Sequence, residues 1–563
     1  MDAFTKEPKI AYFSMEIGVR SNMPTYSGGL GVLAGDTIKS AADLTLPVVA
    51  VTLLTKKGYF RQELDIYGRQ TELPDEFDPL RFMSPLQERV VVNIEGREVV
   101  IGSWIYLVES ATGGKVPIIF LDADFPENTP EDRTITHCLY GGKSDYRLKQ
   151  EIVLGIGGTR MLDELGFQIR KYHMNEGHSS LLTLELLRRY KKDIEEVWDE
   201  NLVWDVDKVR SFCVFTTHTP VAAGHDKFTY DTVQRVMGEI IPMSAIKAFA
   251  GQENLNLTLL ALNLSNYING VAKKHGEVSK EMFPGYAIHA ITNGVHSFTW
   301  TCDSLKRIYD KYLPGWANEP EIFVRVGRIP DNELWEAHME AKRQLIDYVN
   351  RETQAGMNYD TFTIGFARRV TAYKRADLLF SDIDRLARMA EGRLQIVYAG
   401  KAHPHDESGK KLIERIFEIK ERLKDKIRIA FLKNYSMDIA LKITSGVDVW
   451  LNTPLRPLEA SGTSGMKAAH NGVPNFSVLD GWWIEGHIEG FTGWAIGPSP
   501  DVPADPARDA DDLYYKLEGI ILPTFYNDKL FWIRIMQNAI GKNAYYFNSH
   551  RMMRRYVTAA YIR

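Results

Sequence analysis

Short apolar runs alternate with amphipathic segments along the second half of the chain. The runs TFTIGFA (361–367) and LQIVYAG (394–400) predict buried strands. The segments RADLLFSDIDRLARMA (375–390) and KLIERIFEIKERL (411–423) have apolar residues at helical spacing. This alternation is typical of βαβ units, in which helices cover both faces of a parallel sheet. The series continues with IRIAFL (427–432), MDIALKIT (437–444), VDVWL (447–451), SGMKAAHNG (464–472) and PNFSVLD (474–480).

The first half of the chain shows the same alternation with interruptions. KIAYFSME (9–16) and LPVVAVTLL (46–54) predict strands, and GVLAGDTIKSAADL (31–44) predicts a helix between them. The stretch 55–150 is less regular, which predicts antiparallel insertions. Further elements are expected at EIVLGIGGTRMLDELG (151–166), YHMN (172–175), SSLLTLELLRRY (179–190), CVFTTHT (213–219) and YAIHAITNG (286–294).

Two doubly wound α/β domains facing a cleft account for this pattern. We expect the first Rossmann-like domain over residues 1–298 and the second over 299–540, with a connection inside 298–330. A last helix within 541–563 is expected to pack back on the first domain. In such sheets ligands bind beyond the carboxyl ends of the strands, beside glycine-rich turns and helix N-termini.

Length and composition fit a soluble protein with several domains. The 563 residues predict two to four domains at roughly 150 residues each, and 44% hydrophobic with 25% charged residues is ordinary globular composition. Lysine and arginine number 68 against 73 acidic residues, so no overall basic field suggests nucleic acid or an anionic membrane. Cys138, Cys213 and Cys302 are too scattered for a disulfide framework or a thiolate metal site. The N-terminus has no apolar signal core and no stretch approaches the ~20 apolar residues of a membrane span, so we expect a cytoplasmic protein.

The segment PLEASGTSGMKAAHNG (457–472) lies between a predicted strand and a predicted helix. Its small residues from Ala460 to Gly465 let the backbone approach a ligand closely and leave amides free to bind an anion. Lys467, beside these glycines and partly desolvated, is a candidate Schiff-base amine because burial lowers the pKa of an amine. On spacing alone, a glycine-rich turn with a solvated lysine is an equal alternative.

Two other motifs overlap this segment. Ser464 and Lys467 match the S-x-x-K motif of serine acyl-enzymes, but the supporting S-D-N and K-T-G elements are absent from the sequence. Glu459 fits the first glutamate of the E-x7-E pattern of retaining nucleotide-sugar glycosyltransferases, but the eighth residue on is Lys467. An α-glucan synthase-like transferase that uses a nucleotide sugar stays the alternative interpretation.

The run from Glu459 to Thr463, followed by Met466 and Lys467, matches the E-A-S-G-T-x-x-M-K motif of the α-glucan (glycogen, starch, maltodextrin) phosphorylases. The chain resembles this family, and NGVPNFSVLDGWW (471–483) resembles its compact bacterial and archaeal branch. The resemblance continues in order at YFSME (12–16), SGGLGVLAGD (27–36), RLKQE (147–151), NGVAKKHGE (269–277), TNGV (292–295), RRVTAYKR (368–375), GKAHP (400–404) and NY (434–435).

The resemblance implies a GT-B-type glycosyltransferase architecture and a pyridoxal 5′-phosphate (PLP) cofactor held as an imine by Lys467. The implied reaction is phosphorolysis of terminal α-1,4-glucosidic bonds in glycogen, starch or maltodextrin, which releases α-glucose-1-phosphate with retention of configuration. The phosphate of the cofactor acts on the substrate phosphate in this family, so no carboxylate pair is required, unlike the usual hydrolases. The implied partners are the glucan and inorganic phosphate, and family habit suggests a homodimer. A non-catalytic glucan-binding protein is a third interpretation, against which the retained Lys467 argues, since a binder needs no cofactor tether.

The resemblance also assigns the site residues. The expected catalytic residues are Lys467, Lys374, Arg369, His218 and Glu459. PLP is expected to contact Lys467, Arg368, Thr463, Ser464, Tyr435 and Trp300. The glucan and inorganic phosphate are expected to contact Gly28, Gly29, Leu30, His218, Asn293, Arg369, Tyr373, Lys374, Glu459, Ser461 and Gly462.

Two phosphate dianions placed close together repel each other, so the site needs fixed cations and amide dipoles. Arg368, Arg369 and Lys374 supply cations within eight residues, and the nearby Arg375 is expected at a solvated helix position. The amides of the glycine loop, SGGLG (27–31), would complete the anion site from the other domain. The same loop also fits a variant of the dinucleotide fingerprint, G-x-G-x-x-A, but lacks a well-placed acidic ribose partner.

Two details bear on the completeness of this site. Ser436 stands after Asn434 and Tyr435, where the long phosphorylases have an arginine that helps to hold the cofactor phosphate. One cation of the cofactor shell is therefore unassigned. The cluster YHMNEGHSS (172–180) contains two histidines and a glutamate, but its spacing is not H-E-x-x-H, and no metal is expected.

Overall fold

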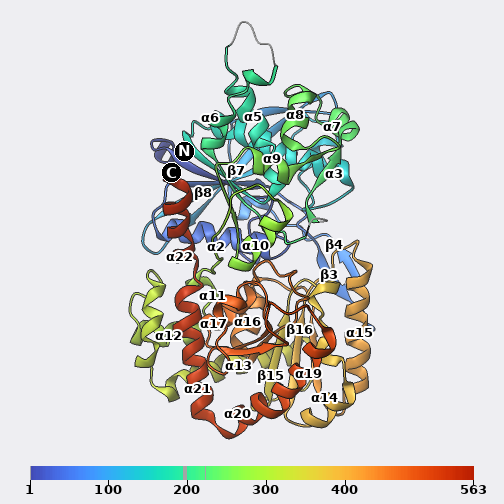
Figure 1. Ribbon diagram of the computed structural model, residues 1–563, viewed down its shortest axis with the longest axis vertical. Coiled ribbons are helices and arrows are strands. Elements are labelled where there is room, and N and C mark those ends of the chain that lie inside the picture. The colour runs from blue at the N-terminus through green and yellow to red at the C-terminus, as the bar shows by residue number, and fades with distance from the viewer. Residues whose placement is uncertain (1, 194–199, 222–223, 563) are drawn as a thin grey trace.

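The structure, a computed structural model, describes residues 2–193, 200–221 and 224–562. It consists of two α/β halves stacked along the long axis of the molecule, each built around one large sheet (Figure 1). The prediction of two doubly wound, Rossmann-like domains is confirmed by this architecture. All the strands of the second sheet and most of those of the first run parallel, with helices on their faces, as expected of crossover connections.

The first sheet has the strand order β14-β13-β10-β9-β1-β2-β8-β7-β5, and β6 pairs with β7. The strands from β14 to β8 are parallel, whereas β5, β6 and β8 each pair with β7 in antiparallel fashion. This confirms the antiparallel insertions expected over 55–150. The strands are β1 (Lys9–Phe13), β2 (Val48–Leu53), β5 (Ser84–Pro85), β6 (Val90–Ile94), β7 (Arg97–Glu109), β8 (Lys115–Asp122), β9 (Ile169–Asn175), β10 (Cys213–Thr216), β13 (Tyr267–Gly270) and β14 (Ile288–Ala290).

The second sheet is entirely parallel, with the order β17-β16-β15-β18-β19-β20. In chain order this is 3-2-1-4-5-6, and the strand order reverses between β15 and β18. The loops that follow these two strands therefore meet at one crevice. The strands are β15 (Phe362–Ala367), β16 (Leu394–Ala399), β17 (Arg428–Leu432), β18 (Val449–Asn452), β19 (Asn475–Val478) and β20 (Gly493–Ile496).

The helices agree with the predicted pattern with one clear exception. The segment 375–390 has a short 3₁₀ helix at Leu378–Phe380 and becomes α-helical only from residue 383. The reason is that Arg375 has a left-handed backbone (φ 46°) and Asp382 caps a new helix by accepting from the amide of Arg385 (2.9 Å). The helices up to residue 300 are α1 (Asp2–Thr5), α2 (Gly29–Asp43), α3 (Ser144–Ile152), α4 (Gly158–Glu164), α5 (Leu182–Arg189), α6 (Val206–Phe212), α7 (Tyr230–Val236), α8 (Met243–Ala250), α9 (Leu257–Asn263), α10 (Lys273–Met282) and α11 (Ser297–Trp300). The later helices are α12 (Asp303–Tyr312), α13 (Asp331–Thr353), α14 (Ile383–Ala390), α15 (Glu407–Leu423), α16 (Met437–Gly446), α17 (Ser464–His470), α18 (Trp483–Gly486), α19 (Pro506–Lys516), α20 (Leu522–Asn527), α21 (Lys529–Asn538) and α22 (Ser549–Tyr556).

Two segments tie the halves together on opposite sides (Figure 1). The hairpin of β3 (Arg61–Leu64) and β4 (Gln70–Leu73) reaches the second half, where the Gln62 amide donates to Asn434 (2.7 Å) and Ala402 donates to Gln70 (3.0 Å). On the other side α22 returns to the first half. Its buried side chains share an apolar cluster with β1, β2 and α2, to which it contributes Met552, Met553 and Tyr556.

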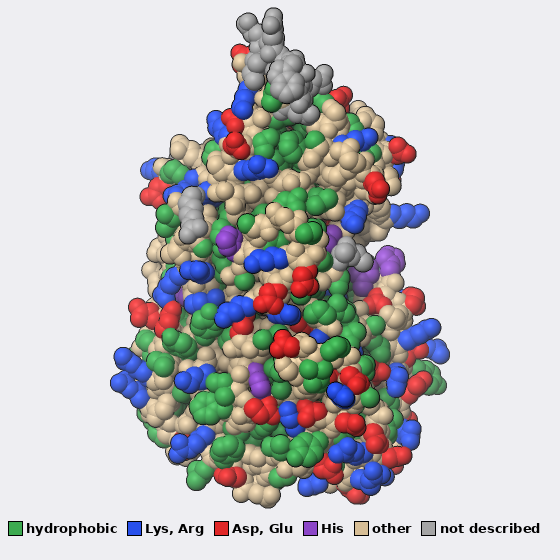
Figure 2. Space-filling view, in the orientation of Figure 1, with side chains coloured by type: hydrophobic (Ala, Val, Ile, Leu, Met, Phe, Trp, Pro, Cys, Tyr) green, Lys and Arg blue, Asp and Glu red, His purple; other side chains and the backbone are tan. Residues whose placement is uncertain are grey.

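The visible surface mixes both signs of charge. On the face in Figure 2, basic and acidic side chains are interspersed over both halves, in keeping with the near balance of 68 and 73 charged residues. Among the described helices, none combines the length and the apolar character that a membrane span requires.

Candidate active site

The crevice of the second sheet brings two predicted cations onto one predicted carboxylate. Arg368 follows β15, and Glu459 follows β18. Arg368 Nη2 and Lys374 Nζ both donate to Oε2 of Glu459, each at 2.6 Å. Burial favours the neutral acid, but the positive charges of Arg368 and Lys374 outweigh it and lower the pKa of Glu459 to about 2. Glu459 is therefore ionised and compensates two cations at once.

Arg368 has donors to spare at this crevice. Its Nε and Nη1 are buried and have no hydrogen-bond partner among the described residues. A buried guanidinium with two unpaired N–H groups is costly unless a ligand accepts from them. Arg368 is therefore prepared for an anion that accepts from several N–H groups, which a phosphate does.

Arg369 has other neighbours than Arg368. Its side chain is exposed, and the titratable groups around it are Tyr373, Tyr59 and Glu16. Glu16 and Tyr59 belong to the first half, so Arg369 faces the glycine loop across the crevice. The ring of Tyr373 also lies 4.5 Å from Nζ of Lys374, measured to its centroid.

Lys467 lies in the first turns of α17 and is 6% exposed. Its Nζ lies 3.7 Å from the ring centroid of Trp300 on α11, and no described residue accepts a hydrogen bond from it. Burial lowers the pKa of Lys467 to about 8, an effect that Asp36 opposes and Lys39 adds to. The amine is therefore close to the protonation equilibrium that imine formation requires.

Of the hydroxyl residues just before Lys467, Ser464 has a side-chain partner. The Ser464 hydroxyl accepts from the Trp450 indole at 3.2 Å, while the hydroxyl of Thr463 makes no cap to α17. Gly462 has a positive φ of 84°, which a glycine adopts without strain. Ser461 is buried with its hydroxyl unpaired.

The glycine loop contacts an internal carboxylate. Glu16, which is 2% exposed, accepts from the amides of Ser27 (2.5 Å) and Gly28 (3.2 Å) and from the hydroxyl of Tyr140 (2.9 Å). The Gly28 amide, predicted to bind a substrate anion, is thus engaged by Glu16 in this structure. A Cβ built on Gly28 or Gly29 meets no atom within 4 Å, so both residues border open space. Leu30 follows in the first turn of α2.

His218 is held in a defined orientation at the carboxyl edge of the first sheet. Its Nε2 lies 2.6 Å from Oδ1 of Asn175, whose amide group in turn donates to Ser14 (3.2 Å). That network assigns the proton to Nε2 and leaves Nδ1 as an acceptor. Burial lowers the pKa of His218 to about 4, which Glu176 offsets only in part, so the ring is neutral at pH 7.

Asn293 and Tyr435 are two further predicted site residues. Asn293 is 2% exposed with Oδ1 unpaired, and its backbone carbonyl accepts from Arg551 (3.0 Å). Tyr435 lines an interdomain cavity of about 190 Å³ together with Tyr59 and Ser436. The hydroxyl of Ser436, the residue at the position of the family's arginine, caps α16 by accepting from the amide of Ile439 (3.4 Å).

One expectation needs correction. Arg375 is not a solvated helix residue: it donates to the carbonyls of Thr453 and Pro454 and to Asp509 (2.7 Å), and it holds the loop after β18. In the cluster 172–180, His173 bonds Tyr561 (2.6 Å) and Thr216 (2.8 Å) inside the first half.

His178, the other histidine of that cluster, lies beside two carboxylates from outside it. Glu151, His178 and Asp226 have atoms within 4.8 Å of one another. The guanidinium of Arg147 stands between the two carboxylates, 3.7 Å from Glu151 and 3.4 Å from Asp226. A cation of the chain itself therefore already compensates this group.

Sequence reasoning missed Asp480, which follows β19. Its carboxylate accepts from the backbone amides of Glu459 (2.8 Å) and Gly481 (2.9 Å), so it fixes the backbone of the residue that pairs with Arg368 and Lys374. Burial raises the pKa of Asp480 to about 7. Its place in LDGWW, just past the carboxyl end of a predicted strand, was the available signal.

Asp480→Asn is expected to change how stability depends on pH. Because the folded-state pKa of Asp480 is about 7 against an ordinary 3.8, the folded protein binds this proton more tightly than the unfolded chain. The resulting stabilisation is complete below pH 4 and is lost as the pH rises through 7. The native protein should therefore lose stability relative to Asp480→Asn between pH 5 and pH 8, measured as the difference between their unfolding midpoints. A constant difference across this range would contradict the assignment.

Comparison with known proteins places the chain in a family. A family model described as carbohydrate phosphorylase matches residues 238–489. The chain is 40% identical to the maltodextrin phosphorylase of Thermococcus litoralis, over 99% of this chain and 70% of the relative. It is 35% identical to the glycogen phosphorylase of Aquifex aeolicus, over 99% and 86%, and 37% identical to that of Mycobacterium tuberculosis, over 98% and 70%. With the residues of the crevice, these matches show that the chain belongs to the carbohydrate phosphorylase family of glycosyltransferase enzymes.

Proposed function

We propose that the chain is a PLP-dependent α-glucan phosphorylase. It cleaves terminal α-1,4-glucosidic bonds of glycogen, starch or maltodextrin with inorganic phosphate and releases α-glucose-1-phosphate with retention of configuration. The names of the relatives support the glucan as substrate class. The observation that carries the proposal is the pair of unpaired N–H groups on buried Arg368, together with the unpartnered amine of Lys467.

The donor set fits PLP. Lys467 offers a buried amine for a covalent link to the aldehyde, and Trp300 offers an aromatic face next to it. Arg368, with the hydroxyls of Thr463 and Ser464 and with Tyr435, would hold the cofactor phosphate. When bound there, PLP would supply a phosphate group able to act as an acid or an electrostatic partner toward the inorganic phosphate.

Arg369 and Lys374 are proposed to bind the reacting phosphate. Lys374 is 7% exposed, so its interaction with a phosphate oxygen is little weakened by water. In the free protein Glu459 compensates this ammonium group. A phosphate that enters would also contact Lys374. Both cations donate to Oε2 of Glu459, so its other carboxylate oxygen could accept a hydroxyl of the sugar.

His218, Asn293 and Ser461 are proposed to bind the sugar. The glucosyl carbon gains positive charge as the bond breaks, so a cation beside it would oppose the reaction. With a pKa of about 4, His218 is a neutral ring and can accept from a hydroxyl through Nδ1 without this penalty. The unpaired Oδ1 of Asn293 and hydroxyl of Ser461 offer further buried hydrogen-bonding groups to the sugar.

The test combines one chemical and one enzymatic measurement. Purified protein loaded with PLP is reduced with borohydride and mapped by peptide mass spectrometry, and maltodextrin is then incubated with the unreduced holoenzyme and inorganic phosphate. We expect a pyridoxyl-phosphate adduct on Lys467 and phosphate-dependent release of glucose-1-phosphate. An unmodified Lys467, or transfer only from a nucleotide sugar, would contradict the proposal and favour the synthase-like alternative.

A further inference from the structure

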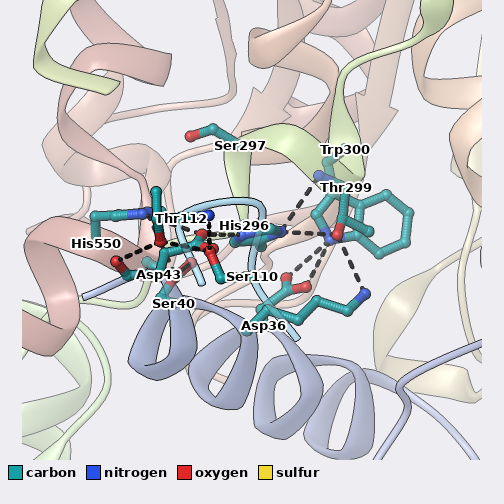
Figure 3. A network of polar contacts seen from close by, with 12 residues as sticks. Asp36, Ser40, Asp43, Ser110, Thr112, His296, Ser297, Thr299, Trp300 and His550 are labelled. Atoms are coloured by element: carbon teal, nitrogen blue, oxygen red, sulfur yellow. Dashed lines mark hydrogen bonds and ion pairs between the residues drawn. The ribbon is translucent and has the colours of Figure 1, made fainter. Parts of the chain in front are cut away.

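Helix α2 carries two charged residues beneath the Lys467 site. Asp36 and Lys39 are three residues apart and so lie on one face of the helix, seven and ten positions after the glycine loop enters it. Figure 3 shows Asp36 directed from α2 toward the indole of Trp300. The indole Nε1 donates to both carboxylate oxygens, at 3.0 and 2.8 Å.

The carboxylate of Asp36 is short of partners for a buried charge. It is 0% exposed, and Trp300 is its one hydrogen-bond donor among the described residues. A buried carboxylate requires charge compensation as well as a hydrogen bond. The cations that face this group are Lys39 and Lys467, and Lys39 donates to the hydroxyl of Thr299 (3.1 Å) instead of to a carboxylate.

The same indole is the surface on which the Lys467 amine rests, 3.7 Å from the ring centroid. Asp36 therefore acts on Lys467 in two ways: it orients the ring by holding its N–H, and it places a negative charge at the N–H edge of that ring. Lys39, on the same helix face, acts on the amine in the opposite sense.

We propose that Asp36 is a positioning residue for Lys467, which anchors the Trp300 ring under the amine and places a negative charge at the edge of that ring. The proposal rests on the proposed function, because it assigns Asp36 to the lysine that would carry PLP. The negative charge of Asp36 favours the protonated form of this amine, which attracts an anion into the buried site, whereas the deprotonated form is the one that attacks an aldehyde. Asp36 thus sets the balance between the two forms.

The test measures the Lys467 amine in protein freed of cofactor. Trace labelling with acetic anhydride between pH 6 and pH 10, followed by peptide mass mapping, gives the pKa of this amine without any cofactor present. We expect about 8 in the native protein. Asp36→Asn, which keeps an acceptor for the indole but removes the charge, should lower the value by roughly one unit. Asp36→Ser serves the same purpose if the first variant does not fold.

Three further variants sharpen the result. Asp43→Asn is the matched control: Asp43 is on the same helix but bonds His296 (2.7 Å) and His550 (3.2 Å), in the part of Figure 3 away from Trp300, so the labelling profile should not move. Lys39→Met should shift the Lys467 profile upward. Trp300→Phe keeps an aromatic ring but removes the one described donor to Asp36, so it should shift the profile downward as Asp36→Asn does.

The outcomes separate this inference from the proposed function. An unchanged profile in both Asp36 variants would overturn it, and so would a shift in Asp43→Asn as large as that in Asp36→Asn. If the shifts occur but PLP never forms an adduct with the native protein, the proposed function fails while the assignment of Asp36 stands.

Discussion

Lys467→Ala is expected to lose phosphorolysis by on the order of 10³-fold or more while it keeps the native fold. Lys467 supplies the proposed covalent attachment for PLP, and no other described lysine lies on an aromatic face in this crevice with a free amine. The measurement is glucose-1-phosphate release from maltodextrin, with circular dichroism to confirm the fold. The absorbance of the bound cofactor should disappear in parallel.

Lys411→Ala serves as the control, since Lys411 is an exposed residue on α15 in the same half. It should keep both activity and cofactor absorbance. Phosphorolysis by Lys467→Ala in the absence of any added amine would remove Lys467 from the proposed mechanism.

Glu459→Gln is expected to destabilise the ligand-free protein by about 3–5 kcal/mol, because it leaves Arg368 and Lys374 buried without a counter-charge. Inorganic phosphate binds cations and should therefore raise the thermal midpoint of this variant more than that of the native protein. The measurement is thermal unfolding with and without millimolar phosphate. Activity should fall as well, since Glu459 is proposed to accept a sugar hydroxyl.

Glu185→Gln provides a matched control for this rescue. Glu185 is 0% exposed and likewise pairs with cations, at 2.9 Å to Arg160 and 2.7 Å to Arg188, but it lies on α5, outside the crevice. It should be destabilised and gain no more from phosphate than the native protein does. Equal rescue of both glutamine variants would show that phosphate acts on the whole protein and not on the Glu459 site.

The sequence predicts those parts of the fold and site that depend on local pattern. Alternating apolar runs were enough to predict five strands of the second sheet, β15 to β19 but not β20, and the run from Glu459 to Lys467 was enough to propose where its chemistry lies. Both signals are local because strand burial and a glycine-rich turn leave their mark on consecutive residues.

Contacts between distant segments could not be predicted in this way. Asp509 turns Arg375 from an expected solvated residue into a buried support for the loop after β18. Glu16 meets the Gly28 amide, and Asp36 meets Trp300, only after the chain has folded. Each of these acids looks like an ordinary polar position in the sequence, because its partner is fixed by tertiary packing and not by periodicity.

The return of α22 to the first half determines when the core of that half can be completed during synthesis. The apolar side chains of Ile10 and Tyr12 in β1 and Val214 in β10 belong to the cluster that Met552 and Tyr556 complete. A nascent chain emerges from the ribosome N-terminus first, so this face of the first sheet stays uncovered until the whole second half has been translated. The first half therefore depends on the second for its last layer of core, and the nascent protein carries an open apolar face, the kind of surface that chaperones bind, throughout that interval.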